Sequence, residues 1–292
     1  MESAVTMSAQ VSELRCFAPA KLNLFLHVIG RREDGYHLLQ TAFQLLDYGD
    51  TIDIKIRSDG ALRRIANDYG VPEEQDLIIR AAQLLKAKTG SLLGADLRLE
   101  KRLPMGGGLG GGSSDAASTL IGLNHLWQCG LNRQKLMELG LQLGADVPFF
   151  IFGHNAFAEG VGEQLQALPT PEQWYVVIEP GIQVPTPLIF SAKELTRDTR
   201  AVKITDFSNR LKNNWKNDLQ AVASTLFPEV KDAIEWLAQH GNAMMTGSGA
   251  CVFCAFDTEK DAQQVFQQVP QKWKAWVAKS LHEHPMRSLI KD

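Results

Sequence analysis

Hydrophobic and polar positions alternate in some parts of this 292-residue chain and recur at helical spacing in others. Alternation over residues 16–28, 51–56 and 95–100 is typical of half-buried β-strands. Apolar residues three and four positions apart predict helices over residues 76–88, 114–127 and 132–143. Residues 1–15 precede these elements, and we expect them to form a flexible N-terminal extension.

The pattern changes past about residue 180. Short apolar runs predict strands at residues 149–152, 174–179, 243–246 and 250–256, and helical spacing predicts helices over residues 187–196, 211–226, 228–240 and 258–268. Several strands come in series before the crossovers, which favours an α+β fold over a strictly alternating parallel one. We expect two domains, residues 16–180 and residues 181–292, arranged as two lobes with the ligand between them.

A glycine-rich run, Pro-Met-Gly-Gly-Gly-Leu-Gly-Gly-Gly-Ser-Ser-Asp at residues 104–115, separates a predicted strand from a predicted helix. Glycines adopt positive φ and let a ligand approach the backbone closely, because they have no Cβ atom. The N-terminus of the following helix presents unpaired N–H groups and the positive end of the helix dipole. A phosphate group is therefore the expected ligand.

Three other interpretations of this run fit less well. A Walker A loop needs a lysine directly before its serine, whereas Gly112 precedes Ser113. A Rossmann fingerprint follows a hydrophobic strand and is followed by an acidic residue about 20 positions later, and neither feature is found here. A flexible linker is a Gly and Ser repeat without apolar residues, whereas Met105 and Leu109 interrupt this run. The pattern favours a different kind of nucleoside triphosphate loop.

Composition excludes several classes of function. The chain is 45% hydrophobic and 22% charged, with a net charge of −3 and no basic block, which argues against a nucleic-acid partner. It has no apolar run of about 18 residues, as a membrane helix requires, and no signal-peptide pattern. Its four cysteines are too few for a disulfide scaffold, and we expect Cys251 and Cys254 to be buried thiols of an apolar strand. A cytoplasmic protein is expected.

Three shorter segments place polar groups in largely apolar surroundings. Lys21 and Asn23 share one face of the first predicted strand, although a surface lysine on an edge strand is an alternative. Asp146 lies among small and apolar residues, where an ionised carboxylate needs a partner. The alternative for Asp146 is a structural role at a helix end. The Thr-Gly-Ser-Gly-Ala sequence at residues 246–250 by itself fits any turn that connects strands.

In chain order, these segments and the glycine run resemble the three motifs of the GHMP kinase superfamily. Two further elements, Arg-Glu-Asp-Gly-Tyr-His at residues 32–37 and Phe-Gln-Leu-Leu-Asp at residues 43–47, resemble its members that phosphorylate a polyol carrying a cytidine diphosphate group in non-mevalonate isoprenoid synthesis. The resemblance extends from about residue 18 to residue 282. It implies an N-terminal lobe similar to domain 2 of ribosomal protein S5 and a ferredoxin-like C-terminal lobe.

The resemblance also implies a reaction and roles for individual residues. ATP would phosphorylate the 2-hydroxyl group of the substrate, and Asp146 would be the base that accepts the hydroxyl proton. Lys21 would keep that carboxylate ionised and stabilise charge on the transferred group. His37 would hydrogen-bond the cytosine ring, with Tyr36 and Phe190 stacked on its two faces. Phosphoryl transfer needs this kind of positioning and charge neutralisation more than covalent catalysis.

Further residues would hold the two ligands. Asn23, Phe43 and Thr186 would contact the substrate. The residues expected to wrap the ATP phosphates are Pro104, Met105, Gly106, Gly107, Gly108, Leu109, Gly110, Gly111, Gly112, Ser113 and Ser114. One of the two serines would lie near Mg²⁺, the expected metal cofactor, and we assign no protein ligand to that ion. The small-molecule substrate is the expected partner of a monomer or weak homodimer, without nucleic acid or membrane.

One position departs from the pattern of the family, and two other functions stay open. Asp76 stands before Leu-Ile where the family usually has Asn near the adenine, and because an ionised Asp cannot donate a hydrogen bond, it would contact adenine differently or simply cap the next helix. A GHMP kinase for homoserine or mevalonate would have no reason to keep Tyr36, His37 and Phe190. An inactive binding protein of this fold would be expected to lose Asp146 or Lys21.

Overall fold

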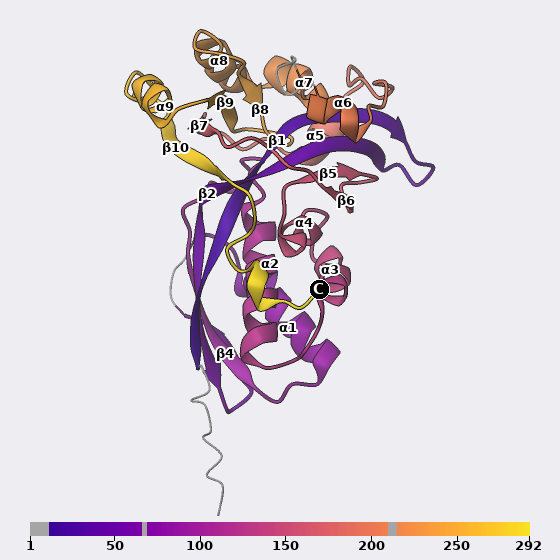
Figure 1. The fold of residues 1–292 in the computed structure, drawn as a ribbon, viewed down its shortest axis with the longest axis vertical. Coiled ribbons are helices and arrows are strands. Elements are labelled where there is room, and N and C mark those ends of the chain that lie inside the picture. The colour runs from indigo at the N-terminus through magenta and orange to yellow at the C-terminus, as the bar shows by residue number, and fades with distance from the viewer. Residues whose placement is uncertain (1–11, 66–68, 210–214) are drawn as a thin grey trace, which may run out of the picture.

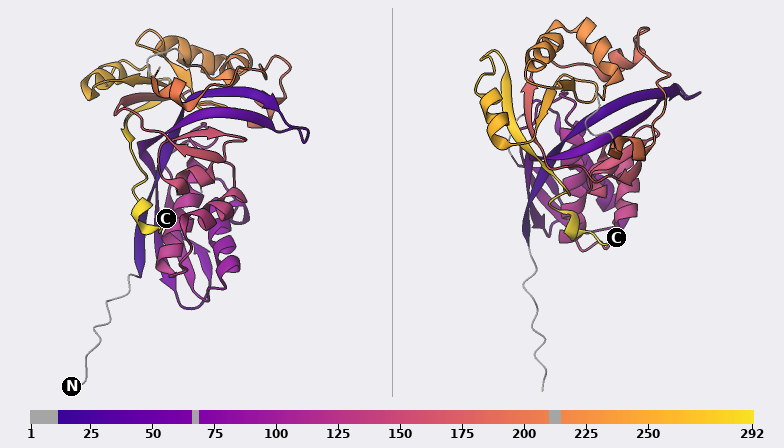
Figure 2. Two further views of the ribbon diagram at one scale, coloured as in Figure 1. Left: turned by 45° about the vertical axis from the view of Figure 1, so that its right-hand side comes forward. Right: turned by 45° about the horizontal axis from the view of Figure 1, so that its top comes forward.

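The computed structural model of the protein describes residues 12–65, 69–209 and 215–292. Two long antiparallel strands, β1 (Glu13–Arg31) and β2 (His37–Arg57), form a ribbon that runs through both lobes of the molecule (Figure 1). Register shifts interrupt their pairing at three points, the first of them between Pro19 and Lys21. Such bulges bend and twist a ribbon, and the two strands curve from the first lobe into the second (Figure 2).

The first lobe packs helices against a sheet. Strand β2 pairs with β4 (Gly94–Glu100), which pairs in parallel with β3 (Leu62–Arg64). The helices are η1 (Glu73–Gln75), α1 (Leu77–Thr89), α2 (Gly111–Leu126), α3 (Arg133–Leu141) and α4 (Val147–Phe152). Ile54, Leu97, Leu120 and Phe150 are buried in the core between these helices and the sheet. A hairpin of β5 (Ala156–Glu159) and β6 (Gln164–Ala167) pairs with β2 nearer to the second lobe.

The second lobe is built on an antiparallel sheet with the strand order β10-β7-β9-β8. Its strands are β7 (Trp174–Glu179), β8 (Met244–Met245), β9 (Val252–Phe256) and β10 (Lys274–Leu281). Its helices are α5 (Thr186–Ser191), α6 (Ile204–Asn209), α7 (Asp218–Leu226), α8 (Pro228–Leu237) and α9 (Glu259–Phe266). Helices lie between the first and second strands and between the third and fourth, which is the βαββαβ arrangement of a ferredoxin-like lobe. The structure therefore confirms that prediction.

The end of the chain joins the lobes. Strand β10 pairs with both β7 and β2, so that the strands of the two lobes form one ten-stranded sheet. The chain then returns to the first lobe, where His284 N–H donates to the carbonyl oxygen of Gly153 at 2.9 Å. A short 3-10 helix, η2 (Arg287–Leu289), follows, and the chain ends beside α3 (Figure 1). Arg133 of α3 forms an ion pair with Asp292 at 2.6 Å.

Most predicted elements are confirmed, with ends that differ by a few residues, but the strand predicted at residues 149–152 is wrong. These residues belong to helix α4, which has Pro148 in its first turn. A run of consecutive apolar residues fits a buried strand and a buried helix equally well. The pattern also misses residues 37–50 of β2, since residues 40–46 are buried on both faces and do not alternate. It does not predict β3, β5, β6, β10 or α6.

The predicted boundaries along the chain also change. Residues 13–15 belong to β1, so the extension predicted for residues 1–15 is too long, and residues 1–11 lie outside the described residues. The boundary expected between residues 180 and 181 does not follow the pairing of the strands, because β7 belongs to the sheet of the second lobe and residues 284–292 lie against the first. The helix predicted from residue 211 begins at Asp218 in the structure, and residues 211–214 are not described.

Candidate active site

The glycine run forms a loop that ends in helix α2, at the junction of the two lobes. Gly106, Gly108 and Gly110 have φ values of 69°, 76° and 72°, in the left-handed region that favours glycine. A Cβ atom on Gly108 would lie 2.1 Å from the carbonyl oxygen of Thr246, so only glycine lets this loop lie against the second lobe. Helix α2 begins at Gly111, three residues earlier than predicted. The last glycines of the run therefore form the first turn of a helix, where N–H groups are free to bind an anion.

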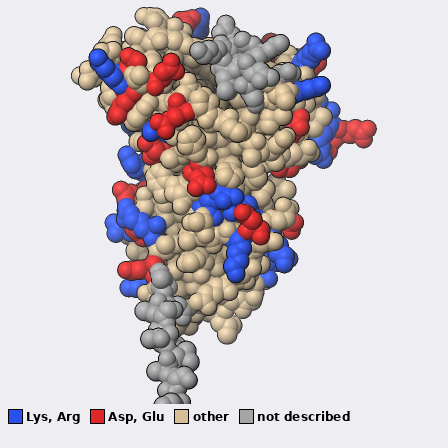
Figure 3. Space-filling model, in the orientation of Figure 1, with Lys and Arg blue, Asp and Glu red and all other residues tan. Residues whose placement is uncertain are grey.

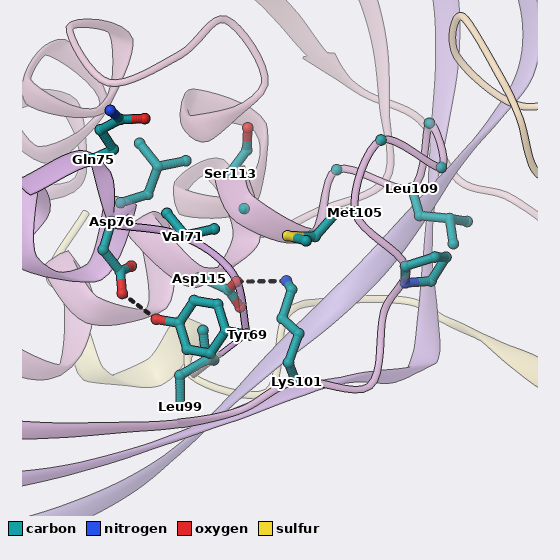
Figure 4. A pocket seen from close by; sticks show the side chains of 18 residues that line it. Tyr69, Val71, Gln75, Asp76, Leu99, Lys101, Met105, Leu109, Ser113 and Asp115 are labelled. Carbon is teal, nitrogen blue, oxygen red and sulfur yellow. Dashed lines mark hydrogen bonds and ion pairs between the residues drawn. The ribbon is translucent and has the colours of Figure 1, made fainter. Parts of the chain in front are cut away.

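A pocket of about 360 Å³ lies on one side of the loop (Figure 4). The loop residues from Pro104 to Ser113 form one wall of this pocket. The remaining wall consists of Tyr69, Val71, Gln75, Asp76, Leu77, Leu99, Lys101 and Asp115. Apolar and polar side chains thus surround a space next to the anion-binding turn, which is what a nucleotide base beside its phosphates requires.

Asp76 caps helix α1. Its Oδ1 accepts a hydrogen bond from Ile78 N–H at 3.1 Å, and its Oδ2 accepts from Arg64 at 3.1 Å and from the hydroxyl of Tyr69. Figure 4 shows Tyr69 and Asp76 turned toward each other. Both carboxylate oxygens are therefore used within the protein, which supports the capping role that the sequence left open.

A buried charge cluster beneath the loop is missing from the sequence prediction. The ammonium group of Lys101 lies 2.6 Å from Asp50 Oδ2 and 2.8 Å from Asp115 Oδ2. Although burial opposes the charged ammonium, the charges of Asp115 and Asp50 raise the pKa of Lys101. The other oxygen of Asp50 accepts from the N–H groups of Arg102 and Leu103. The cluster therefore links β2, the chain just after β4 and the N-terminal half of α2, three segments that share no local sequence pattern.

A second pocket, of about 300 Å³, lies on the other side of the loop and shares Gly106, Gly108 and Gly110 with the first. Six residues predicted from the sequence to form the catalytic and substrate-binding site line this pocket, namely Lys21, Asn23, Phe43, Asp146, Thr186 and Phe190. Thr41, Ser248 and the glycines on either side of Ser248 also line it. The glycine loop therefore forms a wall between the first pocket and a second one that contains a lysine and a carboxylate.

Lys21 is almost fully buried at the edge of this wall. Its ammonium group donates to Asn23 Oδ1 at 2.6 Å and to the carbonyl oxygen of Gly108 at 2.8 Å, and it lies 3.6 Å from Asp146 Oδ2. Burial lowers the pKa of Lys21, and the charge of Asp146 opposes that shift. The alternative of an exposed lysine on an edge strand is therefore wrong. Thr246 Oγ1 accepts from Asn23 N–H at 3.0 Å, so the third predicted motif supports the first.

Asp146 stands directly before helix α4, where a capping residue would lie. Its backbone has helical dihedral angles, and its side chain makes no capping hydrogen bond. The side chain is 32% exposed, with one oxygen near Lys21. The geometry thus favours a role in the pocket over the structural alternative of terminating a helix.

The residues expected to hold cytosine lie farther along the ribbon. The rings of His37 and Phe190 are 4.9 Å apart, and His37 Nε2 accepts a hydrogen bond from Arg197 Nε at 3.0 Å. Tyr36 is 65% exposed at the turn between β1 and β2, and neither Tyr36 nor His37 is among the residues that line the second pocket. The structure therefore brings His37 and Phe190 together and leaves Tyr36 in solvent. The sequence analysis assigned no role to Arg197, and no sequence motif points to this residue.

The two serines of the loop differ in position. Ser113 lines the first pocket, whereas Ser114 is fully buried and its Oγ has no hydrogen-bond partner among the described residues. Within residues 12–65, 69–209 and 215–292, no group of three or more His, Cys, Asp or Glu residues is arranged to hold a metal ion. Mg²⁺ typically uses few protein ligands together with phosphate oxygens and water, so a single hydroxyl such as that of Ser113 fits such an ion.

The prediction of two buried thiols agrees with the structure. Cys251 and Cys254 are buried, and burial raises the pKa of Cys254 to about 11. Acidic and basic side chains are interspersed on the face in Figure 3, without a continuous basic surface. No helix in the described part of the chain is both long and apolar enough to cross a membrane.

The phosphate-binding geometry of the loop and the lysine–carboxylate pair beside it together fit phosphoryl transfer to an alcohol. Two family models, described as GHMP kinases N terminal domain and GHMP kinases C terminal, match residues 76–154 and 199–275. The chain therefore belongs to the GHMP kinase family and is a kinase with the α+β fold of that family.

Individual relatives of the chain have names that are more specific than those of the two family models. The chain is 62% identical to 4-diphosphocytidyl-2-C-methyl-D-erythritol kinase of Herminiimonas arsenicoxydans, across 94% of this chain and 97% of the relative. A crystal structure of 4-(cytidine 5'-diphospho)-2C-methyl-D-erythritol kinase is 35% identical, with a TM-score of 0.81 over 91% of this chain and 99% of that one. Homoserine kinase of Cytophaga hutchinsonii has a TM-score of 0.73 over 96% and 98% of the two chains but is 15% identical, and so shares the fold alone. The closer resemblance predicted from residues 32–37 and 43–47 is confirmed.

Proposed function

We propose that the chain transfers the γ-phosphoryl group of ATP to the 2-hydroxyl group of 4-diphosphocytidyl-2-C-methyl-D-erythritol, giving the 2-phosphate and ADP. This reaction would belong to the non-mevalonate route to isopentenyl diphosphate. The names of the relatives support the acceptor, and membership of the GHMP kinase family supports ATP as the donor. The observation that carries the proposal is the pairing of Lys21 with Asp146 beside the glycine loop, with Asp146 free of any capping bond.

Each of the two pockets would bind one of the two substrates. ATP occupies the pocket lined by Tyr69 and Lys101, with its phosphates on the first turn of α2, and the cytidine substrate occupies the pocket lined by Asp146. Because the pockets share three glycines without side chains, the γ-phosphoryl group and the acceptor hydroxyl can meet across the loop. Holding both reactants in line is the main contribution that a kinase makes to this chemistry.

The side chains of the second pocket would accept the proton of the 2-hydroxyl group and stabilise the negative charge on the transferred phosphoryl group. Asp146 accepts the proton of the 2-hydroxyl group as its oxygen attacks phosphorus, and becomes a neutral carboxylic acid. Lys21 has donors directed at Asn23 and Gly108, which keep its ammonium group beside both the carboxylate and the loop. From there its charge favours ionised Asp146 and stabilises the negative charge on the transferred group.

Magnesium and the cytidine group complete the proposed complex. Ser113 would hold Mg²⁺ together with the ATP phosphates, and the ion would supply charge neutralisation to them. His37 and Phe190 would hold the cytosine ring through a hydrogen bond and a stacking contact. Tyr36 would have to move from its exposed position to cover the other face of the ring.

An ADP-release assay with alternative acceptors tests the proposal. We expect turnover with 4-diphosphocytidyl-2-C-methyl-D-erythritol and none with homoserine or mevalonate, and ³¹P NMR of the product should place the new phosphate on the 2-hydroxyl oxygen. Faster turnover of either simple alcohol would show that the chain is a different GHMP kinase. Binding of ATP and of the cytidine substrate without ADP release would show an inactive binding protein.

A further inference from the structure

Arg197 links the two residues that are proposed to hold cytosine. Its Nε donates to His37 Nε2 at 3.0 Å, and its Nη2 donates to the carbonyl oxygens of Phe190 and Ala192 at 2.9 and 2.7 Å. Its Nη1 donates to the carbonyl oxygen of Leu195 at 3.0 Å. Four of the five N–H donors of the guanidinium group thus bind acceptors from α5, from the chain that follows it and from the start of β2, so the orientation of the group is fixed on several sides.

The segment that carries Arg197 is itself anchored to the ribbon. Thr199 N–H donates to the carbonyl oxygen of Val28 in β1 at 3.1 Å. Gln40 of β2 accepts from Val202 N–H at 2.8 Å and donates to the Val202 carbonyl oxygen at 3.1 Å. These contacts lie on both strands of the ribbon, so Arg197 is held against His37 by the fold and does not reach it from a free surface loop.

The contact between the two side chains determines where the imidazole proton lies. An arginine side chain only donates hydrogen bonds and stays protonated in proteins. His37 Nε2 must therefore be an unprotonated acceptor, and its single proton must lie on Nδ1. Burial and the positive charges of Arg197, from the segment after α5, and Arg31, from β1, lower the pKa of His37. Both effects keep the imidazole neutral with a donor at Nδ1.

We propose that Arg197 is a positioning residue that sets base specificity by fixing His37 as an Nδ1–H donor. The inference rests on the proposed function and names the residue that makes His37 selective. Cytosine has an unprotonated N3 that accepts a hydrogen bond, whereas uracil has a proton on N3 and donates there. A histidine restricted to donating at Nδ1 therefore pairs with cytosine N3 and repels uracil N3–H. A histidine that can adopt either neutral tautomer would bind both cytosine and uracil.

Arg197→Met removes the donors and keeps an unbranched stem, and its kinetics test the proposal. At about pH 8, we expect KM for the cytidine substrate to rise about tenfold, with kcat and KM for ATP almost unchanged. The preference in kcat/KM for the cytidine substrate over its uridine analogue should fall about tenfold, because neutral His37 then also carries its proton on Nε2. Arg200→Met, at an exposed arginine of the same segment, is the matched control and should retain both values.

The pH dependence of the variant separates tautomer control from structural damage. Arg197→Met removes one of the positive charges that lower the pKa of His37, so acid protonates both ring nitrogens of His37 more readily in the variant, which restores the Nδ1 donor. The kcat/KM of the variant for the cytidine substrate, divided by that of the wild type at the same pH, should therefore rise several-fold between about pH 8 and about pH 6. Loss of structure around Phe190 would not be relieved by acid. A ratio that stays constant or falls overturns the proposal.

Nitrogen NMR of the protein with ¹⁵N-labelled histidine gives a readout that needs no substrate. The wild type should show a neutral Nδ1–H tautomer for His37, assigned by its loss in His37→Gln, and Arg197→Met should shift that signal toward the Nε2–H form. A wild-type Nε2–H tautomer, or an unchanged tautomer in the variant, contradicts the proposal. Absence of activity with the cytidine substrate, together with the expected NMR result, would contradict the proposed function and leave the tautomer assignment standing.

Discussion

The carboxylate of Asp146 stands at the start of α4 without capping it, and one of its oxygens lies 3.6 Å from the ammonium group of Lys21. A capping aspartate is replaced by asparagine at little cost, because both side chains accept a hydrogen bond from the helix N-terminus. An aspartate that acts as a base and counter-ion cannot be replaced by asparagine in this way, because the asparagine amide has no negative charge and does not accept a proton. The same substitution therefore distinguishes the structural role of this residue from the chemical one.

Asp146→Asn should lower kcat by about 100- to 10,000-fold, the range of general-base catalysis. The affinities for ATP and the cytidine substrate should change little, and the free energy of unfolding should fall only by the lost ion pair with Lys21, since no capping bond is lost. Steady-state turnover, titration calorimetry and urea unfolding measure these quantities.

The control for this substitution is Asp257→Asn, at an exposed carboxylate directly after β9, which should leave turnover unchanged. If Asp146→Asn retained more than about a tenth of wild-type turnover, the loss would be much smaller than the loss of a general base causes. That result would contradict the catalytic assignment.

At the scale of elements, the glycine loop lies directly against the loop at Thr246, whose Oγ1 also donates to the carbonyl oxygen of Gly108 at 3.3 Å. Gly107 accepts from Cys251 N–H at 3.1 Å, and the Gly108 Cα faces the carbonyl oxygen of Thr246. The first and second lobes thus meet at the loop that is proposed to hold the ATP phosphates. Gly106 has a similar φ, but a Cβ atom added to it would lie 3.7 Å from the side chain of Gln183, an ordinary packing distance.

Gly108→Ala and Gly106→Ala form a matched pair with the same backbone strain. We expect Gly106→Ala to lower the free energy of unfolding by about 1 kcal/mol, from the left-handed conformation alone. Gly108→Ala should lower it by about 2–4 kcal/mol, because overpacking against Thr246 adds to that strain. Urea unfolding measures both, and equal values would show that the contact between the lobes is not tightly packed.

A third prediction concerns the far end of the β1–β2 ribbon, which carries His37. His37→Ala should raise KM for the cytidine substrate by about 5- to 150-fold, equivalent to a buried hydrogen bond of about 1–3 kcal/mol. KM for ATP should stay the same, because His37 lines neither pocket that contains the loop. A change confined to KM for ATP would place His37 on the nucleotide side and contradict the substrate assignment.

At the scale of the whole molecule, the chain returns from the second lobe to the first through His284. This histidine is buried, its Nδ1 accepts from Met286 N–H at 3.1 Å, and its Nε2 lies 3.5 Å from Ser118 Oγ. Burial and the charge of Arg133 lower the pKa of His284 to about 3. The folded protein therefore holds this histidine neutral where the unfolded chain, with a pKa of about 6.5, becomes protonated.

Because the folded pKa of His284 is below the unfolded one, the unfolded state gains stability as pH falls from about 6.5 toward 3. This group should lower the free energy of unfolding by about 2 kcal/mol between about pH 7 and about pH 5. His284→Asn retains an acceptor for Met286 and does not titrate, so its stability should fall by about 2 kcal/mol less over that interval. Urea unfolding at both pH values measures the difference.

The exposed neighbour His282 is the matched control, and His282→Asn should show the pH dependence of the wild type. Identical pH dependence of His284→Asn and the wild type would show that His284 titrates normally in the folded protein.

Local sequence pattern was sufficient for the α+β class, for helices such as α1 and α2, and for the strands β1, β4 and β7. Alternation and helical spacing indicate which side of an element faces the core, and a few neighbouring residues are enough to show the pattern. The sequence also predicted the glycine loop before α2, because positive φ at several nearby positions leaves few residue types other than glycine. The roles of Lys21, Asp146 and the cytidine-side residues came from the family resemblance and remain predictions.

Only tertiary structure decided the identity of α4, the full length of β2 and the partners of the buried charges. Apolar runs such as residues 149–152 fit either a helix or a strand, and packing against the sheet selects between them. The pairs Lys101–Asp50 and Arg197–His37 join residues more than 50 and more than 150 positions apart. Ion pairs and hydrogen bonds form between neighbours in space, and the burial that makes them energetically important exists only after the chain has folded.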